Sequence, residues 1–362
     1  MTPRKRAENH ADIEAQLRML ERGDGEGELS FGRGVTLHVS SLAKPYFPKA
    51  GVTKGALMRY YTRVAPMLLP EIEGRALVLK RYPDGVTGPM FFQQNAGEHV
   101  PDVVRVATLD TVELGAKPRI IGGDLATLLY TVQLGTIEVH PWLSRVEDVE
   151  APDRCLIDLD PGDDVSFADV AALARDVARI AEERGLAVAL KTSGASGIHI
   201  VLPLPPRTSY ETSAELAQRL ADAVVAANPE TATVERSIKA RPKGSIYVDA
   251  LQNARGKSMA APYSVRARPA ASVSAPLRAR DLTSRLRIEA FTVSTMPARL
   301  TRVGDLWGDA IATRPTARAL ARAMASLQEA SATPPSRRGS TRRNRAGGTR
   351  AGSTAGRRAR RG

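Results

Sequence analysis

The chain has 362 residues and a formal net charge of +13. This length can hold one large domain or two modest ones, each with a proper core. The single cysteine, Cys155, excludes an intramolecular disulfide and a cysteine-cluster zinc site, and it is typical of a reducing cytoplasm. The sequence contains no run of about 18 apolar residues, so it predicts no membrane span. The basic segment 1–6 is not followed by the apolar stretch of a signal peptide. We therefore expect a cytoplasmic protein.

The positive charge is concentrated at the C-terminal end. Residues 331–362 contain ten arginines and no acidic residue, so they carry +10 of the net charge and leave +3 for residues 1–330. This segment is too poor in apolar residues to bury a core, and we expect it to be disordered. Two interpretations stay open: an arm that binds phosphate backbones without regard to sequence, or a solvated appendage.

Helical and strand periodicities then predict the organisation of the chain. Residues 1–33 are charged, with one short helix over 11–22 before a glycine-rich breaker, and we expect a flexible extension. A folded domain is expected over 34–305, a C-terminal helix over 306–330 and the tail over 331–362. The predicted helices are 53–68, 124–138, 166–184, 210–227, 281–289 and 316–327, and the predicted strands are 75–81, 154–160, 186–191, 197–204 and 245–251. Alternating strands and helices with at least one hairpin indicate a mixed α/β or α+β domain.

Two carboxylates occur one residue apart in the predicted strand over 154–160. Side chains at i and i+2 of a strand share a face, so Asp158 and Asp160 point together. Adjacent carboxylates repel unless they are protonated or bridged by cations, and hard oxygen ligands suit Mg²⁺ or Mn²⁺. A two-metal site for phosphoryl transfer and a solvated pair at a strand end both remain open.

Three further features favour phosphoryl transfer. Asp249 lies near the end of another predicted strand and could complete a two-metal site. The loop over 193–199 has two glycines, two serine hydroxyls and His199, and such a backbone can approach an anion closely. Basic residues surround Asp249, and arginine forks match phosphate oxygens. Each feature also has a structural alternative: a solvated strand end, turn glycines, a buried histidine or a surface charge run.

Ordered sequence blocks over about residues 35–300 resemble one known family. The most specific blocks are Leu79-Lys80-Arg81-Tyr82-Pro83-Asp84-Gly85-Val86 with Phe91-Phe92-Gln93, Glu138-Val139-His140-Pro141-Trp142, Asp158-Leu159-Asp160-Pro161, Ser193-Gly194-Ala195-Ser196-Gly197-Ile198-His199, Tyr247-Val248-Asp249 with Gln252-Asn253, and Ala261-Pro262-Tyr263-Ser264-Val265-Arg266. Together they resemble the polymerase domain of the bacterial end-joining ligase LigD, a branch of the archaeo-eukaryotic primase superfamily.

The resemblance implies a fold and a set of site residues. The fold is α+β, with a mixed or antiparallel sheet flanked by helices. Asp158, Asp160 and Asp249 are implied to be the catalytic residues and to hold two Mg²⁺ or Mn²⁺ ions. The residues implied to bind the incoming nucleotide are Lys80, Phe91, Phe92, His140, Ser193, His199, Arg241, Lys243, Gln252 and Arg266. Those implied to bind the 5′-phosphate of a DNA break are Ser41, Lys44 and Lys54.

The sequence also departs from the family pattern. Ser41 stands where the family usually has Asn, and Ala43 and Pro45 replace an acidic residue and a valine. Ser196 replaces a lysine of the second metal-motif block, which removes one positive charge near the expected triphosphate. No K-x-D-G ligase nucleophile occurs, so we expect a stand-alone polymerase.

The implied activity is the addition of nucleotides, with ribonucleotides preferred, to DNA 3′ ends at gaps or double-strand breaks in non-homologous end joining. The implied partners are DNA, nucleoside triphosphates, Ku and a separate ATP-dependent DNA ligase, in the bacterial nucleoid. Two alternatives stay open. One is a non-catalytic module that binds and aligns DNA ends, and the other is a primase that starts chains de novo.

Overall fold

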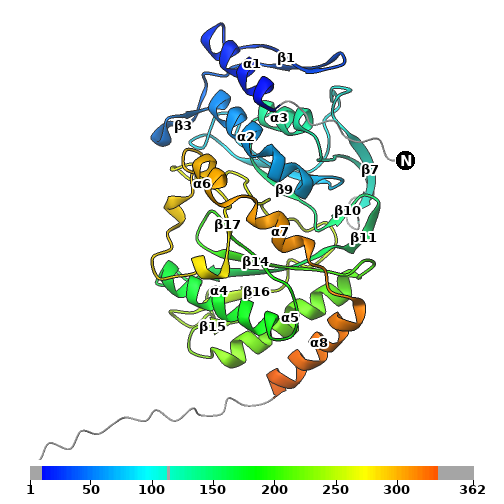
Figure 1. Cartoon of the computed structure of the whole chain (residues 1–362), viewed down its shortest axis with the longest axis vertical. Coiled ribbons are helices and arrows are strands. Elements are labelled where there is room, and N and C mark those ends of the chain that lie inside the picture. Colours follow the sequence, from blue (N-terminus) through cyan, green and yellow to red (C-terminus); the bar gives the residue numbers. More distant parts are fainter. Residues whose placement is uncertain (1–9, 112–114, 333–362) are drawn as a thin grey trace, which may run out of the picture.

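A computed structural model describes residues 10–111 and 115–332 (Figure 1). Its first half forms an upper lobe that contains a three-stranded sheet of order β6-β5-β9 and several two-stranded ribbons. The elements of this half are α1 (His10–Arg22), β1 (Gly27–Gly32), β2 (Val35–Val39), β3 (Pro45–Phe47), η1 (Pro48–Ala50), β4 (Val52–Thr53), α2 (Lys54–Ile72), β5 (Leu77–Arg81), β6 (Phe91–Gln93), β7 (Val106–Thr111), β8 (Gly115–Ile120), α3 (Leu125–Gln133) and β9 (Thr136–Pro141).

The second half builds a lower lobe around a six-stranded sheet of order β15-β16-β12-β14-β13-β17. All neighbouring strands in it are antiparallel except β15 and β16, so the sheet is mixed. The predicted α+β class is thereby confirmed. The elements are β10 (Ser144–Arg145), β11 (Asp148–Pro152), β12 (Arg154–Pro161), α4 (Phe167–Glu182), β13 (Ala189–Thr192), β14 (Ile198–Pro203), α5 (Tyr210–Ala227), β15 (Ala232–Thr233), β16 (Ile246–Asp249), β17 (Pro276–Leu277), η2 (Ala279–Asp281), η3 (Ile288–Ala290), α6 (Met296–Val303), α7 (Leu306–Ala312) and α8 (Ala317–Ala332).

The two faces of the sheet have different neighbours. Helices α4 and α5 start at serine N-caps, Ser166 and Ser209, whose hydroxyls accept backbone N–H groups of the first turn. Their apolar faces cover one side of β12, where the buried Cys155 thiol donates to the Ser213 carbonyl of α5. Because strand side chains alternate, Leu156, Asp158 and Asp160 lie on the opposite side, toward the upper lobe.

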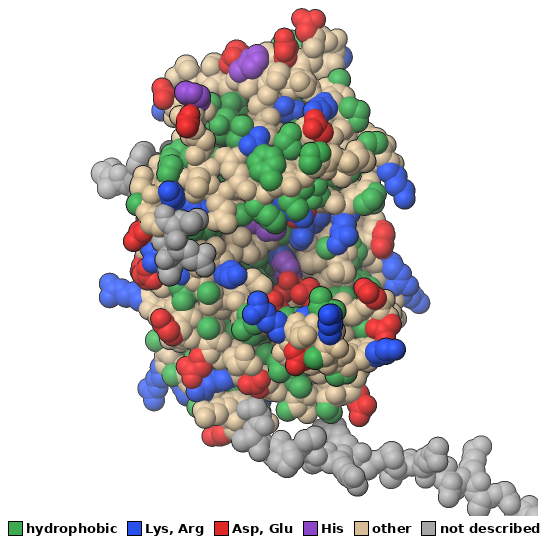
Figure 2. All heavy atoms as spheres, turned by 180° about the vertical axis from the view of Figure 1, so that it is seen from behind, with side chains coloured by type: hydrophobic (Ala, Val, Ile, Leu, Met, Phe, Trp, Pro, Cys, Tyr) green, Lys and Arg blue, Asp and Glu red, His purple; other side chains and the backbone are tan. Residues whose placement is uncertain are grey.

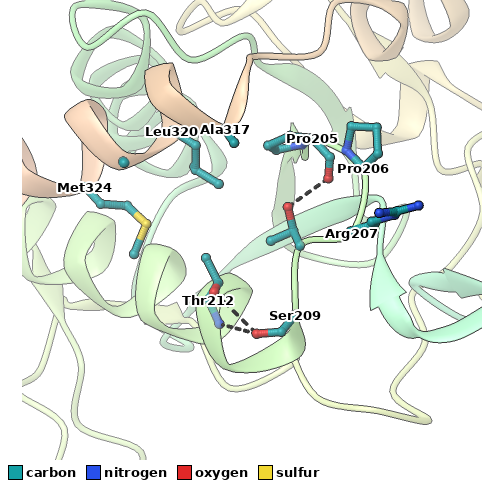
Figure 3. Close-up of a pocket in the computed structure, with 10 residues that line it drawn as sticks. Pro205, Pro206, Arg207, Ser209, Thr212, Ala317, Leu320 and Met324 are labelled. Carbon is teal, nitrogen blue, oxygen red and sulfur yellow. Dashed lines mark hydrogen bonds between the residues drawn. The ribbon is translucent and has the colours of Figure 1, made fainter.

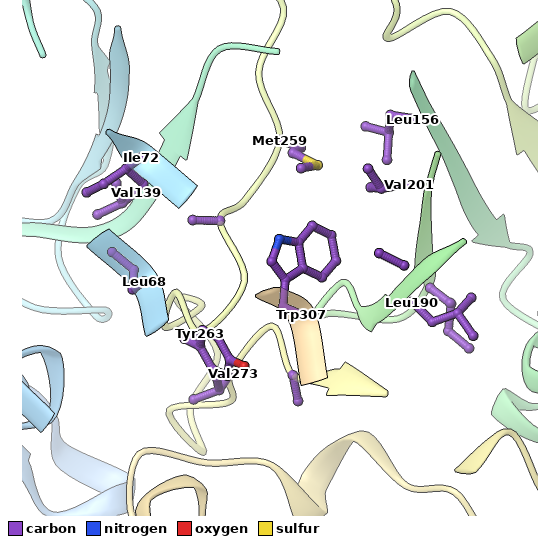
Figure 4. Packing of buried hydrophobic residues seen from close by; sticks show 14 of the residues in the cluster. Leu68, Ile72, Val139, Leu156, Leu190, Val201, Met259, Tyr263, Val273 and Trp307 are labelled. Carbon is purple, nitrogen blue, oxygen red and sulfur yellow. The ribbon is translucent and has the colours of Figure 1, made fainter. Parts of the chain in front are cut away.

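One hydrophobic core runs through both lobes. Trp307 of α7 is 1% exposed and lies at its centre (Figure 4). Leu68 of α2 lies on one side of the indole, toward the upper lobe, and Leu156 of β12 and Leu190 of β13 lie on the other side, toward the sheet (Figure 4). The lobes are therefore joined by packed side chains as well as by the chain itself.

A buried ionic cluster at the start of β12 reinforces this junction. The Asp153 carboxylate accepts two hydrogen bonds of 2.6 Å from Arg75, which is 0% exposed, and one of 3.0 Å from Arg154. Arg154 also pairs with Glu71 of α2 at 2.5 Å. Burial raises the pKa of Asp153, but Arg154 and Arg75 outweigh it and hold that pKa well below its ordinary value. The cluster fixes β12 against α2.

The expected flexible extension over 1–33 is wrong for residues 10–33. The apolar face of α1 buries Ile13 and Leu17 against the core, and Glu14 and Glu21 pair with arginines of α2. The glycine-rich segment after α1 leads into a hairpin, β1–β2, which buries Leu29. Tertiary burial outweighs the low local hydrophobicity that suggested flexibility.

Two predicted helices also differ from the structure. The helix predicted over 124–138 ends at Gln133, because Gly135 adopts φ 90° and the β-branched residues after it form strand β9. The helix predicted over 281–289 is replaced by two short 3₁₀ turns, η2 and η3, and Asp281 accepts from the backbone N–H of Arg278. The predicted C-terminal helix over 306–330 is two helices, α7 and α8.

The arginine-rich tail predicted over 331–362 lies outside the described residues, except for residues 331 and 332 at the end of α8. Within the described ranges, no helix combines the length and the apolarity that crossing a bilayer requires.

Candidate active site

The three predicted carboxylates are neighbours on one face of the six-stranded sheet. Asp158 of β12 is the direct cross-strand partner of Asp249 of β16, and Asp160 is the partner of Tyr247. Directly opposed residues of an antiparallel pair project from the same face, and Asp158 and Asp160 share a face by alternation. Figure 2 shows acidic and histidine side chains together in a hollow in the middle of one side of the molecule.

The electrostatics reflect this crowding. Burial raises the pKa of Asp160, and the negative charges of Asp158 and Asp249 raise it further, to about 7. Burial also raises the pKa of Asp158, but the neighbouring His199 and Lys191 outweigh it and lower that pKa overall. The Asp158 Oδ1 atom is buried and has no hydrogen-bond partner among the described residues. Asp160 is therefore the carboxylate of the pair whose negative charge is less well compensated by its neighbours.

Strand β12 pairs with β16 along one edge and with β14 along the other, and His199 of β14 lies next to Asp158 on that second edge. The two residues are cross-strand partners, and His199 Nε2 lies 3.4 Å from Asp158 Oδ1. The Nδ1 atom of the same ring lies 2.6 Å from the Nζ of Lys191 on β13, and burial lowers the pKa of His199 to about 4. The sequence interpretation missed Lys191. The one sequence signal for Lys191 is a lysine inside an apolar strand. In the structure it is the cross-strand partner of His199.

Asp249 is held by groups that follow it in the chain. Its carboxylate accepts from the Leu251 N–H at 2.8 Å and from the Gln252 side-chain amide at 2.9 Å. The amide of Asn253 bonds both the N–H and the C=O of Leu156, at 2.8 and 2.7 Å. Asn253 thus replaces a strand partner for β12 where β16 ends, while the expected nucleotide ligand Gln252 contacts a carboxylate.

The loop over 193–199 is closed on itself. The Ser193 hydroxyl accepts the N–H groups of Ala195 and Gly197 at 3.1 and 3.0 Å, which leaves its own hydrogen as a donor. A Cβ on Gly197 would lie 2.1 Å from the Leu159 carbonyl oxygen, so only glycine permits this approach to β12. The expected backbone cradle for an anion is therefore wrong for these two amides, because both point at Ser193.

Three of the expected nucleotide ligands meet at Glu138 of β9. This carboxylate is 2% exposed and lies 3.2 Å from Lys80 Nζ, 3.0 Å from His140 Nε2 and 2.9 Å from Arg266 Nε. Arg266 also donates to the Ser193 carbonyl, so it connects this group to the loop. Burial raises the pKa of Glu138, but His140, Arg266 and the backbone N–H of Ala267 outweigh it and lower that pKa strongly. Sequence reasoning missed Glu138 as a site residue, although it lies in the same block as His140.

Two phenylalanines next to this group face solvent. Phe91 is 44% and Phe92 55% exposed, which is unusual for such large apolar side chains. The Lys80 Nζ lies 5.9 Å from the Phe92 ring centre, and the Arg81 guanidinium lies 4.9 Å from that of Phe91. Exposed aromatic rings beside cations form a surface on which a nucleic-acid base can stack.

The remaining expected nucleotide ligands lie on the loop before β16. The Arg241 guanidinium stacks on the Tyr247 ring at 4.2 Å and donates to the carbonyls of Glu235 and Arg236. It is close enough to lower the pKa of Asp160. Lys243 is exposed on the same loop. The structure thus places Arg241 near the carboxylates, with its Nε and Nη2 atoms bonded within the loop.

The three expected 5′-phosphate ligands lie together in the upper lobe. Ser41 adopts φ 58°, Lys44 pairs with the exposed Asp84 at 2.7 Å, and Lys54 donates to the Ser40 carbonyl at 3.0 Å. Lys54 is 4% exposed, and burial together with the charge of Lys44 lowers its pKa to about 8. The two lysines are therefore close enough to repel each other, which favours an anion between them.

The carboxylate face offers oxygen ligands for a divalent cation. Among the described residues, no three His, Cys, Asp or Glu side chains already form a group that could hold a metal ion. The chemistry fits one nevertheless, because Asp158, Asp160 and Asp249 supply hard oxygens on one face. Asp158 Oδ1 lacks a hydrogen bond, and the pKa of Asp160 is raised by its anionic neighbours. A cation would relieve both conditions.

Two cavities differ in their position relative to this site. One of about 340 Å³ adjoins it, between Pro161 at the end of β12 and Ser196 of the loop. Another, of about 380 Å³, lies between α8 and the start of α5 (Figure 3). Pro205, Thr212 and Met324 line it, and none of the expected site residues does. We therefore assign the candidate site to the carboxylate face.

The chain is similar to known proteins of one family. The family model described as LigD, primase-polymerase domain, matches residues 53–307. The multifunctional non-homologous end joining protein LigD of Pseudomonas aeruginosa is 32% identical over 270 residues, which cover 74% of this chain and 32% of that protein. The bifunctional LigD of Bacillus subtilis is 32% identical over 269 residues, covering 74% of this chain and 43% of that protein. The chain thus spans about a third of the length of the first relative and less than half of the second.

A solved structure extends the match to three dimensions. The polymerase domain from Mycobacterium tuberculosis ligase D in complex with DNA superposes with a TM-score of 0.71 at 30% identity. The superposition covers 77% of this chain and 99% of that domain. The resemblance seen in the sequence blocks is confirmed, and the chain belongs to the LigD primase-polymerase domain family.

Proposed function

We propose that the chain is a nucleotidyltransferase that adds nucleotides to DNA 3′ ends at gaps or double-strand breaks, in non-homologous end joining. The observation that carries this proposal is the register that pairs Asp158 with Asp249 and puts Asp160 on the same face. The family and the end-joining names of the relatives support it. The DNA bound to the related ligase D polymerase domain supports DNA as the partner.

In this proposal, the three carboxylates hold two Mg²⁺ or Mn²⁺ ions. When bound, such ions neutralise charge on the phosphates and on the attacking 3′-oxygen. The protein side contributes position: β12 and β16 fix Asp158 and Asp249, and Asn253 holds β12 beyond the end of β16. Phosphoryl transfer needs little else from a protein than positioning and electrostatic stabilisation.

The incoming nucleotide lies, in our proposal, between the loop over 193–199 and the group around Glu138. The Ser193 hydroxyl and His199 Nε2 supply hydrogen-bond donors for its phosphates, and Arg266 adds positive charge. Phe92 offers its exposed ring to the base, beside Lys80. We expect ribonucleotides to be preferred, as the family resemblance implies.

We assign binding of the 5′-phosphate at the far end of a DNA gap to the upper lobe. Lys44 and Lys54 repel each other, so a 5′-phosphate that binds both relieves that repulsion. Ku and a separate ATP-dependent DNA ligase are the proposed protein partners, because the relatives are end-joining proteins.

An incorporation assay tests the proposal. Labelled ATP or dATP is supplied with Mn²⁺ on a gapped duplex, with and without a 5′-phosphate at the gap. We expect primer extension, more with ATP, and more with the phosphate. Asp158→Ala should abolish extension and leave DNA binding nearly unchanged, whereas Asp176→Ala, on the exposed surface of α4, should change neither.

The alternatives give different results in the same assay. If the wild-type chain binds the duplex and incorporates nothing, it is an end-binding module. If it makes products on an unprimed template, it is a primase. Extension that survives Asp158→Ala would remove the assignment of the carboxylates.

A further inference from the structure

A lysine is buried beside the candidate site without a carboxylate partner. Lys191 of β13 is 0% exposed, and no described acidic side chain lies within ion-pair distance of its Nζ. Its partners among the described residues are the Nδ1 of His199 at 2.6 Å and the hydroxyl of Ser274 at 2.9 Å. Burying an amine is costly unless its donors are used. These two contacts offset part of the cost of burying Lys191.

The directions of these hydrogen bonds follow from the partners. The Ser274 hydroxyl donates to the Thr192 carbonyl at 2.8 Å, so it accepts from Lys191. Lys191 is then a donor with hydrogens to spare, and His199 Nδ1 at 2.6 Å is the acceptor that faces it. With the amine charged, a proton on Nδ1 would place two donors against each other at that distance; only an uncharged amine has a lone pair that could accept it.

The other edge of the imidazole leads to the same conclusion. His199 Nε2 lies 3.4 Å from Asp158 Oδ1, which has no hydrogen bond of its own. If Nε2 lacked a proton, a lone pair on nitrogen would face a carboxylate oxygen. With the proton on Nε2, both edges of the ring face complementary atoms.

We propose that Lys191 is a positioning residue that holds His199 in the tautomer with the proton on Nε2. Resting on the proposed function, the consequence is that His199 presents an N–H donor to the phosphates of the incoming nucleotide. The opposite tautomer would present a lone pair to a phosphate oxygen. Lys191 acts through His199 and need not touch the nucleotide.

Nuclear magnetic resonance of the wild-type chain tests the tautomer directly. The chain has five histidines, so long-range ¹H–¹⁵N correlations of the rings can be assigned, with His199→Asn identifying the resonances of interest. We expect the pattern of an imidazole protonated at Nε2 for His199. A pattern of protonation at Nδ1 overturns the proposal. The measurement needs neither nucleotide nor DNA, so its outcome is independent of whether the chain is a polymerase.

A variant tests whether Lys191 causes the tautomer. Lys191→Met fills a similar volume without a donor, and its fold is checked by the remaining histidine signals. We expect His199 to populate both tautomers and the Kd for ATP with Mn²⁺ to rise about tenfold, the order of one hydrogen bond to a charged group, with DNA binding unchanged. Lys117→Met, on the β8 hairpin, should leave both readouts as in wild type. An unchanged His199 spectrum in a folded Lys191→Met chain refutes the role of Lys191.

Discussion

Replacing Asp160 by asparagine should stabilise the protein at neutral and alkaline pH. Asp160 has a pKa of about 7 instead of 3.8, first because of burial and then because of the charges of Asp158 and Asp249. At about 1.4 kcal/mol for a tenfold change in proton affinity, this difference sets an upper bound of roughly 4 kcal/mol. Part of the side chain contacts water, which screens the neighbouring charges, so we expect about 1–2 kcal/mol for Asp160→Asn.

The pH dependence of this stability difference follows from linkage between protonation and folding. The folded chain binds the Asp160 proton more tightly than the unfolded chain, so the penalty is absent below the ordinary pKa of 3.8. It develops as the pH rises toward 7. Urea denaturation of wild type and Asp160→Asn across that range should show a stability difference that grows with pH and then levels off.

Manganese ions give the complementary measurement. They should raise the Tm of wild type by binding the folded state, and they should raise that of Asp160→Asn much less. Asp176→Asn on the surface of α4 is the matched control, and it should follow wild type in both experiments. If Asp160→Asn is no more stable than wild type at about pH 8, or if its advantage does not vary with pH, the carboxylates do not repel each other as the structure indicates.

Further predictions concern the junction and the ligand-binding groups. Asp153→Asn should lose about 3–5 kcal/mol of stability in urea denaturation near pH 7, because buried arginines lose their partner; since the folded-state pKa of Asp153 is lowered, the advantage of wild type should shrink as the pH falls below 3.8. Glu138→Gln should weaken nucleotide binding about tenfold in calorimetry, because three basic side chains lose the carboxylate that orients them; equal affinity would contradict this role. Phe92→Ala should cost about 1–3 kcal/mol of nucleotide or DNA affinity if a base stacks there, with an unchanged Tm because the ring is exposed. Lys44→Ala should remove the preference for 5′-phosphorylated gaps and keep extension of unphosphorylated ones; an unchanged ratio would argue against the phosphate assignment.

The elements around the site could be predicted from local patterns. The alternation in β12 predicts that Asp158 and Asp160 share a face, and serine caps predict where α4 and α5 begin. These features depend on residues close together in the chain. They needed no knowledge of the fold.

Pairing between distant segments could not be predicted in this way. Nothing in the residues of β12 specifies β16 as a neighbour or places Asp249 beside Asp158. Glu138 and Lys191 become site residues only because tertiary contacts bring basic groups or a histidine to them. The N-terminal segment shows the same limit, since α1 is polar on average and becomes ordered through the few side chains that it buries.

The shared core around Trp307 also has a consequence for the DNA. A hinge between lobes needs an interface that can open, and here the indole lies in one buried core that contains residues of both. The distance between the lysines of the upper lobe and the acidic face of the sheet is therefore fixed by the fold. In the proposed function, a DNA gap that occupies both places has to match this fixed spacing, so we expect extension to depend on the length of the missing stretch of strand.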